Sequence, residues 1–195
     1  MSPCNRIGIL GGSFNPVHIG HIQLADYIAQ TQGLSEVWLM LSPRNPLKQY
    51  SESTPADDVR LQMLDIAAKA SPRLKVCDIE LSMPRPSYTV DSLNKLQNLY
   101  PDTDFSLIIG SDNWLEFHRW KDYRILIDRF SPIVYPRPGY DVDISSLPST
   151  VTLVNAPMCD ISSTLIRSAI AGGIDMNLFL PTGVMQYIQQ NHLYL

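Results

Sequence analysis

The chain has 195 residues, of which 45% are apolar and 17% charged, ordinary values for a globular protein. This length favours one domain over residues 1–195, with a core large enough to fold alone. The formal net charge of −4 excludes a broad electrostatic attraction to nucleic acid or to anionic membranes, so an anionic ligand must be bound by local charge.

Membrane segments and structural metals are not expected. No apolar stretch is long enough to span a bilayer, and the first residues lack the apolar part of a signal peptide. The three cysteines, Cys4, Cys77 and Cys159, form neither a CxxC pair nor a zinc-ligand spacing. They therefore predict free thiols in a reducing compartment, and we expect a cytoplasmic protein.

Apolar runs alternate with helical patterns along the chain. Strands are predicted over residues 6–10, 36–42, 74–81, 105–110, 132–135 and 151–154. Helices are predicted over residues 19–30, 54–70, 90–99, 163–171 and 181–190. The strand runs are almost continuously apolar, which is typical of strands covered on both faces. The alternation predicts an α/β fold with a mostly parallel sheet.

Some helix ends also have sequence signals. Thr54, Pro55 and Asp57 resemble an N-cap, a first-turn proline and the acidic residue of a capping box. Gly172 and Gly173 follow the helix predicted over residues 163–171 and favour its C-terminal cap. In parallel α/β sheets, ligands bind where strands end and strand order reverses, so the loops after strands are the candidate sites.

The loop after the first strand carries the strongest motif. Residues 11–21 read Gly-Gly-Ser-Phe-Asn-Pro-Val-His-Ile-Gly-His. The glycines allow close approach of a bound group, and the following helix start favours an anion. His18 and His21 are three residues apart and can face the same way, with Gly20 leaving space between them. Two histidines at a helix start can also simply cap or pack.

A second motif lies near the C-terminus. Residues 159–167 read Cys-Asp-Ile-Ser-Ser-Thr-Leu-Ile-Arg. Ser162 or Ser163 can cap the next helix, and Arg167 adds a permanent positive charge that suits phosphate oxygens. Taken alone, this segment fits an ordinary capped helix with a solvated arginine equally well.

Together these motifs resemble the nucleotidyltransferase superfamily. Residues 11–21 are similar to Gly-x-Phe-Asp-x-x-His-x-Gly-His, with Asn15 in place of Asp, and residues 161–167 match Ile-Ser-Ser-Thr-x-Ile-Arg. Residues 87–93 resemble the Ser-Tyr-Thr-x-Asp-Thr-Leu segment of nicotinate mononucleotide adenylyltransferases, with Ser92 for Thr. The resemblance covers residues 7–188. It implies a Rossmann-like doubly wound parallel sheet with a small C-terminal helical part.

The resemblance also implies roles for individual residues. The catalytic group would be His18, His21, Lys48 and Arg167. The ATP-binding group would be Gly11, Gly12, Ser13, Phe14, Gly110, Asp112, Ile161, Ser162, Ser163 and Thr164. The acceptor-binding group would be Tyr88, Thr89, Trp120 and Arg137. On spacing alone, Asp112 also fits a helix cap and Trp120 also fits core packing. Arg60 matches a family position, but we interpret it as structural.

Two positions depart from the family pattern. Lys48 follows Pro46-Leu47, where relatives often have Pro-Pro-His-Lys. Asn15 replaces Asp, and we expect it to keep a helix-capping role because both residues cap well.

The implied reaction is adenylyl transfer from ATP to nicotinate mononucleotide, which yields deamido-NAD and pyrophosphate. The acceptor phosphate would attack the α-phosphorus in line, with adenine near the strand at residues 105–110 and His18 donating to the α-phosphate. A protonated imidazole would donate best, although a neutral one still donates one bond. Mg²⁺ would be carried with ATP, because no carboxylate cluster for a metal is apparent.

Several alternatives stay open at this point. Nicotinamide mononucleotide or phosphopantetheine could be the acceptor. A cytidylyltransferase is disfavoured because the chain has no Arg-Thr-x-Gly-Ile-Ser-Thr motif, and a catalytically silent nucleotide-binding module has no need for four intact catalytic residues. The sequence is compatible with a homo-oligomer and leaves the oligomeric state open.

Overall fold

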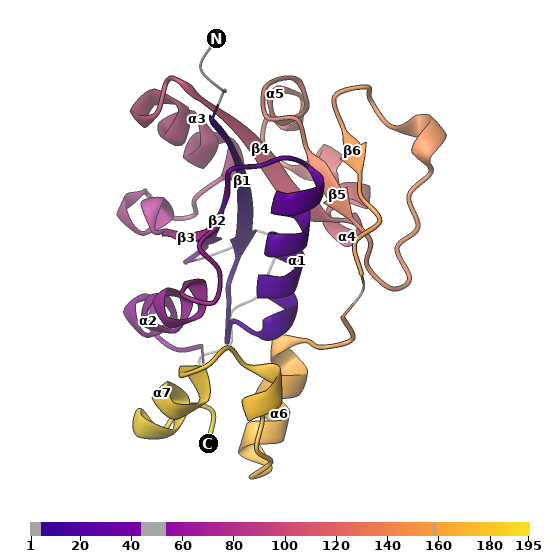
Figure 1. The fold of residues 1–195 in the computed structure, drawn as a ribbon. Helices are drawn as coiled ribbons and strands as arrows, with labels where there is room; N and C mark the ends of the chain where they lie inside the picture. The colour runs from indigo at the N-terminus through magenta and orange to yellow at the C-terminus, as the bar shows by residue number, and fades with distance from the viewer. Residues whose placement is uncertain (1–4, 44–53, 158) are drawn as a thin grey trace.

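The architecture is that of a doubly wound parallel sheet. A computed structural model describes residues 5–43, 54–157 and 159–195, and within them six parallel strands lie in the order β3-β2-β1-β4-β5-β6 (Figure 1). The strands are β1 (Asn5–Gly12), β2 (Glu36–Leu41), β3 (Leu74–Cys77), β4 (Thr103–Gly110), β5 (Ile133–Tyr135) and β6 (Thr152–Leu153). Strand order reverses between β1 and β4, which confirms the predicted fold class and marks the expected binding edge.

Helices cover both faces of this sheet. The α-helices are α1 (Ile19–Thr31), α2 (Asp57–Ala68), α3 (Thr89–Leu99), α4 (Ser111–Leu115), α5 (Tyr123–Arg129), α6 (Ser163–Ala171) and α7 (Val184–Gln190). The 3-10 helices are η1 (Ile79–Ser82), η2 (Phe117–Arg119), η3 (Ile144–Ser146) and η4 (Asn177–Phe179). Figure 1 shows α6 and α7 together at the end where β1 leads into α1. They form the predicted C-terminal helical part.

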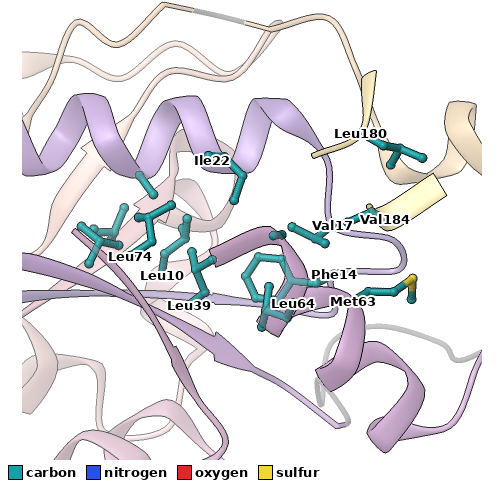
Figure 2. Packing of buried hydrophobic residues seen from close by; sticks show 14 of the residues in the cluster. Leu10, Phe14, Val17, Ile22, Leu39, Met63, Leu64, Leu74, Leu180 and Val184 are labelled. Carbon is teal, nitrogen blue, oxygen red and sulfur yellow. The ribbon is translucent and has the colours of Figure 1, made fainter. Parts of the chain in front are cut away.

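Two hydrophobic clusters lie on opposite faces of the sheet. Along β1, Leu10 belongs to the first cluster and Ile9 to the second, because successive strand residues point to opposite faces. The first cluster joins the sheet to α1, α2, α6 and α7 (Figure 2). The second joins it to α3, η2 and α5. This double coverage explains why the strand sequences are continuously apolar.

The buried face of α1 agrees with its predicted periodicity. Its buried residues are Ile22, Ala25, Ile28 and Ala29. The helix begins after His18, which is its N-cap. The expectation that Asn15 caps a helix is therefore wrong, because the backbone reaches the first turn three residues later.

Other element ends differ from the predictions for local reasons. Ala56, not Thr54, is the N-cap of α2, and the Asp57 carboxylate bonds to Arg60 and Arg85 instead of completing a capping box. The run predicted as a strand over residues 74–81 is divided, because the chain turns into η1 after β3. The last helix starts later than predicted, at Val184, after Gly183 with a φ of 89°.

The short helices α4 and α5 were not predicted. They have only 5 and 7 residues, too few to show a clear helical period. In contrast, the predicted end of α6 is confirmed: Gly172 is its C-cap and Gly173 has a φ of 74°. None of the helices within the described residues is long and apolar enough to cross a membrane.

Candidate active site

Two clefts open at the edge of the sheet where its parallel strands end. The larger encloses about 1100 Å³ of empty space, counting its open mouth, and the smaller about 470 Å³. The larger is lined by the predicted residues Gly11, Gly12, Ser13, Tyr88, Thr89, Gly110 and Trp120. The smaller is lined by the predicted residues His18, His21, Arg137 and Ile161. Tyr135, at the end of β5, lines both clefts, so they adjoin at this edge of the sheet.

His18 and His21 lie against each other at the start of α1. Their ring centroids are 3.7 Å apart, which confirms that the two side chains share a face. The backbone N–H of His18 donates to Nδ1 of His21 at 3.2 Å. A neutral His21 ring therefore carries its proton on Nε2. A Cβ on Gly20 would approach His18 Nδ1 to 3.1 Å and Cys159 Sγ to 3.3 Å, so glycine keeps this space open.

The His18 ring is neutral at physiological pH. Burial, and secondly the positive charge of Arg137, lower its pKa from 6.5 to about 4. Its Nδ1 atom is buried and has no hydrogen-bond partner within the described part of the chain. The protonated donor considered from the sequence is thus not the resting form. A neutral ring offers one N–H and one acceptor nitrogen to a ligand.

This shift predicts the titration of His18 in the free protein. As the pH falls from 8 to 5, its imidazole should remain neutral, because the folded-state pKa lies below the ordinary value. Protonation should occur near pH 4. Nitrogen-15 shifts of the histidine rings measure this, and loss of one signal in His18→Gln assigns it. A midpoint at pH 6 or above would contradict the buried, neutral ring.

The N-terminal end of α6 is joined to the first loop. Ser162 is the cap, since its hydroxyl accepts from the Leu165 N–H at 3.1 Å. Ser163 Oγ instead donates to the Pro16 carbonyl at 2.9 Å. Arg167 donates to the Asn15 carbonyl at 2.7 Å and to Thr164 Oγ1 at 3.2 Å. A simply solvated arginine is therefore excluded.

Gly110, Asp112 and Arg137 form the junction between β4 and β5. A Cβ on Gly110 would collide with Asp112 Oδ1 and approach Arg137 Cγ to 3.1 Å. Asp112 Oδ1 lies 3.9 Å from Arg137 Nε, and it lacks a hydrogen-bond partner among the described residues. Gly110, not Asp112, is the N-cap of α4. The helix-cap alternative for Asp112 is thus not realised, and a buried acceptor points to a polar ligand group.

Aromatic side chains form one wall of the larger cleft. Trp120 is half-buried, and its ring lies 5.1 Å from that of Phe117. It therefore both packs on the core and lines the cleft. Lys121 Nζ lies 5.0 Å from the centre of the Tyr88 ring and bonds to Asp91 at 2.8 Å. The wall combines flat apolar surface with positive charge.

Some lining residues were missed by the sequence reasoning. Arg119 and Lys121 flank Trp120 in the larger cleft. Because they are its neighbours in the sequence, they could have been predicted as lining residues together with Trp120. Glu80, only 3% exposed, accepts from Ser87 at 3.1 Å and from Ser92 at 2.7 Å. The sequence analysis did not single out Glu80, because it lies in residues 74–81, which were predicted as a strand. Ser92 keeps the hydroxyl that threonine supplies in the family pattern.

Phe14 packs in the first hydrophobic cluster at 2% exposure, and its side chain lines neither cleft. Lys48 lies outside the described residues. Across residues 5–43, 54–157 and 159–195, no three His, Cys, Asp or Glu side chains gather closely enough to hold a metal.

The comparisons with known proteins agree with this fold. Residues 9–169 match the cytidylyltransferase-like family, so the chain belongs to this family of nucleotidyltransferases. Within it, the chain groups with the nicotinate-nucleotide adenylyltransferases. It is 46% identical to a relative from Bacteroides fragilis over 95% of this chain and 92% of the relative. It is 47% identical to one from Bacteroides thetaiotaomicron over 97% and 95%. Both carry the name "probable nicotinate-nucleotide adenylyltransferase".

A solved structure supports the fold. The nicotinic acid mononucleotide adenylyltransferase of Plasmodium falciparum, complexed with NaAD, has a TM-score of 0.78 and 24% identity over 97% of each chain. At this identity the likeness concerns the fold.

Proposed function

We propose that this enzyme transfers the adenylyl group of ATP to nicotinate mononucleotide, forming deamido-NAD and pyrophosphate. The observation that carries the proposal is the pair of adjoining clefts at the edge of the sheet where its strands end. One contains the two histidines and the other the aromatic wall. The names of the near relatives support the same reaction.

The larger cleft suits the acceptor. Trp120 and Tyr88 offer aromatic surface for a flat cationic pyridine ring. Thr89 begins α3 at the same cleft, and Lys121 adds a positive charge. Backbone N–H groups at a helix start and a nearby cation both favour an anion. This wall therefore favours the carboxylate of the nicotinate form over the amide of the nicotinamide form.

The smaller cleft suits the adenine of ATP. Its walls include the apolar side chains of Leu24, Pro136, Pro138, Pro157 and Ile161. A flat base can lie against such surfaces. Apart from Leu24 of α1, these residues follow β5 or β6 rather than β4. The proposed position of adenine is therefore at least one strand further along the sheet than the sequence indicated.

The phosphates then lie between the two clefts. His18 and His21 project from the start of α1, while Ser162 caps α6 and Arg167 lies within it. An oxygen of the acceptor phosphate attacks the α-phosphorus, and the bond from that phosphorus to the β-phosphate bridging oxygen breaks. A phosphate oxygen is already nucleophilic at neutral pH, so catalysis depends on positioning and charge neutralisation. Neutral His18 donates its N–H to an α-phosphate or bridging oxygen.

Mg²⁺ would accompany ATP. With no cluster of three metal-binding side chains in the described ranges, the phosphate oxygens and water would supply most of its ligands. When bound, it would neutralise charge on the triphosphate.

The aromatic wall leads to a prediction. In Trp120→Leu, the KM for nicotinate mononucleotide should rise about tenfold, because stacking on the pyridine ring contributes on the order of 1–2 kcal/mol. The KM for ATP should change little. Trp114→Leu is the matched control, since Trp114 stacks on the same Phe117 at 5.3 Å. Equal effects of the two variants would argue against stacking by Trp120.

A direct assay tests the proposed function. Purified protein with ATP and Mg²⁺ is supplied separately with nicotinate mononucleotide, nicotinamide mononucleotide or phosphopantetheine, and pyrophosphate release is measured. We expect the highest kcat/KM with nicotinate mononucleotide. Preference for another acceptor would reassign the larger cleft, and no release with any of them would favour a silent nucleotide-binding module.

We also propose that residues 1–195 act as one unit in the cytoplasm. The two hydrophobic clusters share one sheet, and Cys77 and Cys159 are free thiols, as expected in a reducing compartment. Sizing of the purified protein would measure whether it forms a homo-oligomer.

A further inference from the structure

The loop that connects β1 to α1 is held by donors from the C-terminal part of the chain. Tyr194 Oη donates to Asn15 Oδ1 at 2.7 Å. The Asn15 carbonyl accepts from Arg167, and the Pro16 carbonyl accepts from Ser163. Asn15 is thus bonded through both its side chain and its backbone to residues more than 150 positions away.

The side chains of Asn15 and Tyr194 are largely shielded from water, which stabilises the contact between them. Asn15 is only 9% exposed, so its amide oxygen depends on a protein donor. Tyr194 is half-buried and packs against the first hydrophobic cluster. Burial also raises the pKa of its hydroxyl, which therefore keeps its proton and remains a donor. Figure 2 shows Phe14 and Val17 of the loop among the buried residues that include Leu180 and Val184.

The loop backbone needs such support. Phe14 has a φ of 42°, a left-handed conformation that a bulky residue adopts only when its surroundings impose it. His18 follows four residues later as the N-cap of α1. A small change in this loop would therefore move the imidazole relative to the bound phosphates.

We propose that Tyr194 is a positioning residue for adenylyl transfer, which acts by holding Asn15 and thereby the loop that ends in His18. This inference rests on the proposed function. It also gives Asn15 a role that differs from helix capping. An amide oxygen and a carboxylate oxygen both accept a bond from a tyrosine hydroxyl, so either Asn15 or the aspartate of the family pattern would supply an acceptor for Tyr194.

Tyr194→Phe removes the donor and leaves the ring in place. We expect kcat to fall by about two- to tenfold, the range of one lost hydrogen bond to a buried acceptor. The affinity for nicotinate mononucleotide and the number of sites per chain, both from calorimetry, should stay unchanged, because the Trp120 and Tyr88 rings proposed to bind the pyridine pack on the other face of the sheet from Tyr194. Tyr27→Phe is the matched control. It removes a hydroxyl that donates to the Asn155 carbonyl at 2.9 Å, away from the loop.

A second readout does not depend on turnover. Amide hydrogen exchange in residues 13–18 should become faster in Tyr194→Phe and stay unchanged in Tyr27→Phe. In an Asn15→Ala background, Tyr194→Phe should lower kcat by less than about twofold, because the acceptor is already gone.

The outcomes are distinguishable. The inference would be overturned if Tyr194→Phe had the kcat and the loop exchange rates of the wild type. It would also be overturned if the number of nicotinate mononucleotide sites per chain fell in parallel with kcat, because Tyr194 would then be needed only for folding. Absence of turnover in the wild-type protein would contradict the proposed function. The exchange measurement would still show whether Tyr194 holds the loop at residues 13–18.

Discussion

Replacement of His18 by alanine is expected to lower kcat by about 10²-fold or more, the effect of losing a preorganised donor to a developing charge. The side chain is 6% exposed and lines the smaller cleft next to His21. Its Nδ1 atom has no hydrogen-bond partner among the described residues, so loss of this nitrogen leaves no protein donor without its acceptor. We therefore expect the variant to remain folded while losing transition-state stabilisation.

Steady-state kinetics and thermal unfolding together measure this. His118→Ala provides the control, because it removes an exposed histidine that lines neither cleft, and its kcat should be close to that of the wild type. Near-normal turnover of His18→Ala would remove His18 from the reaction. Loss of folding would instead show that its burial is needed for stability.

Arg60→Met is expected to lower the free energy of unfolding by about 3–5 kcal/mol, because it leaves several acceptors without their donor and each such loss in a buried place costs about 1–3 kcal/mol. Arg60 is fully buried. Its guanidinium donates to the carbonyls of Pro55, Ser13 and Ser42 and pairs with Asp57. Methionine fills a similar volume but leaves three carbonyls and a carboxylate without this donor. This agrees with the structural role interpreted from the sequence.

Arg85→Met is the matched control, because Arg85 bonds to the other oxygen of the same Asp57 but is 53% exposed. An exposed ion pair contributes at most about 1 kcal/mol. Urea unfolding of both variants would measure the difference. Equal losses would mean that burial of Arg60 contributes little, and a loss below about 1 kcal/mol for Arg60→Met would contradict the argument.

Local periodicity and motif spacing predicted much of the fold and part of the site. The buried face of α1 follows from its 3.6-residue period, and the shared orientation of His18 and His21 follows from their spacing. The predicted N-cap of α2 was wrong because a tertiary contact uses the side chain of Asp57. Asp57 serves Arg60, whose other partners include Ser13, 47 residues away, and no local pattern contains that information.

The contacts that support the loop between β1 and α1 could not be predicted from the sequence either. The bond from Tyr194 to Asn15 joins residues 179 positions apart. The sequence therefore showed that Asn15 replaces an aspartate of the family pattern, but it did not show that Tyr194 is its partner. The protonation state of His18 was also not predictable, because it depends on burial and on Arg137, which a later strand delivers. Motifs indicated which residues meet, whereas long-range packing decides their chemistry.

The separation of the two hydrophobic clusters has an evolutionary consequence. The acceptor wall is built on the α3 and η2 side of the sheet, and the histidine cleft on the α1 and α6 side. Tyr135 lines both clefts, and the larger one also includes Gly11, Gly12 and Ser13 of the loop that leads to His18. Substitutions can therefore accumulate on one side and change which phosphate monoester is adenylylated, while the transfer chemistry on the other side is inherited intact. Such a division allows one ancestral scaffold to diversify its acceptors without reinventing the reaction.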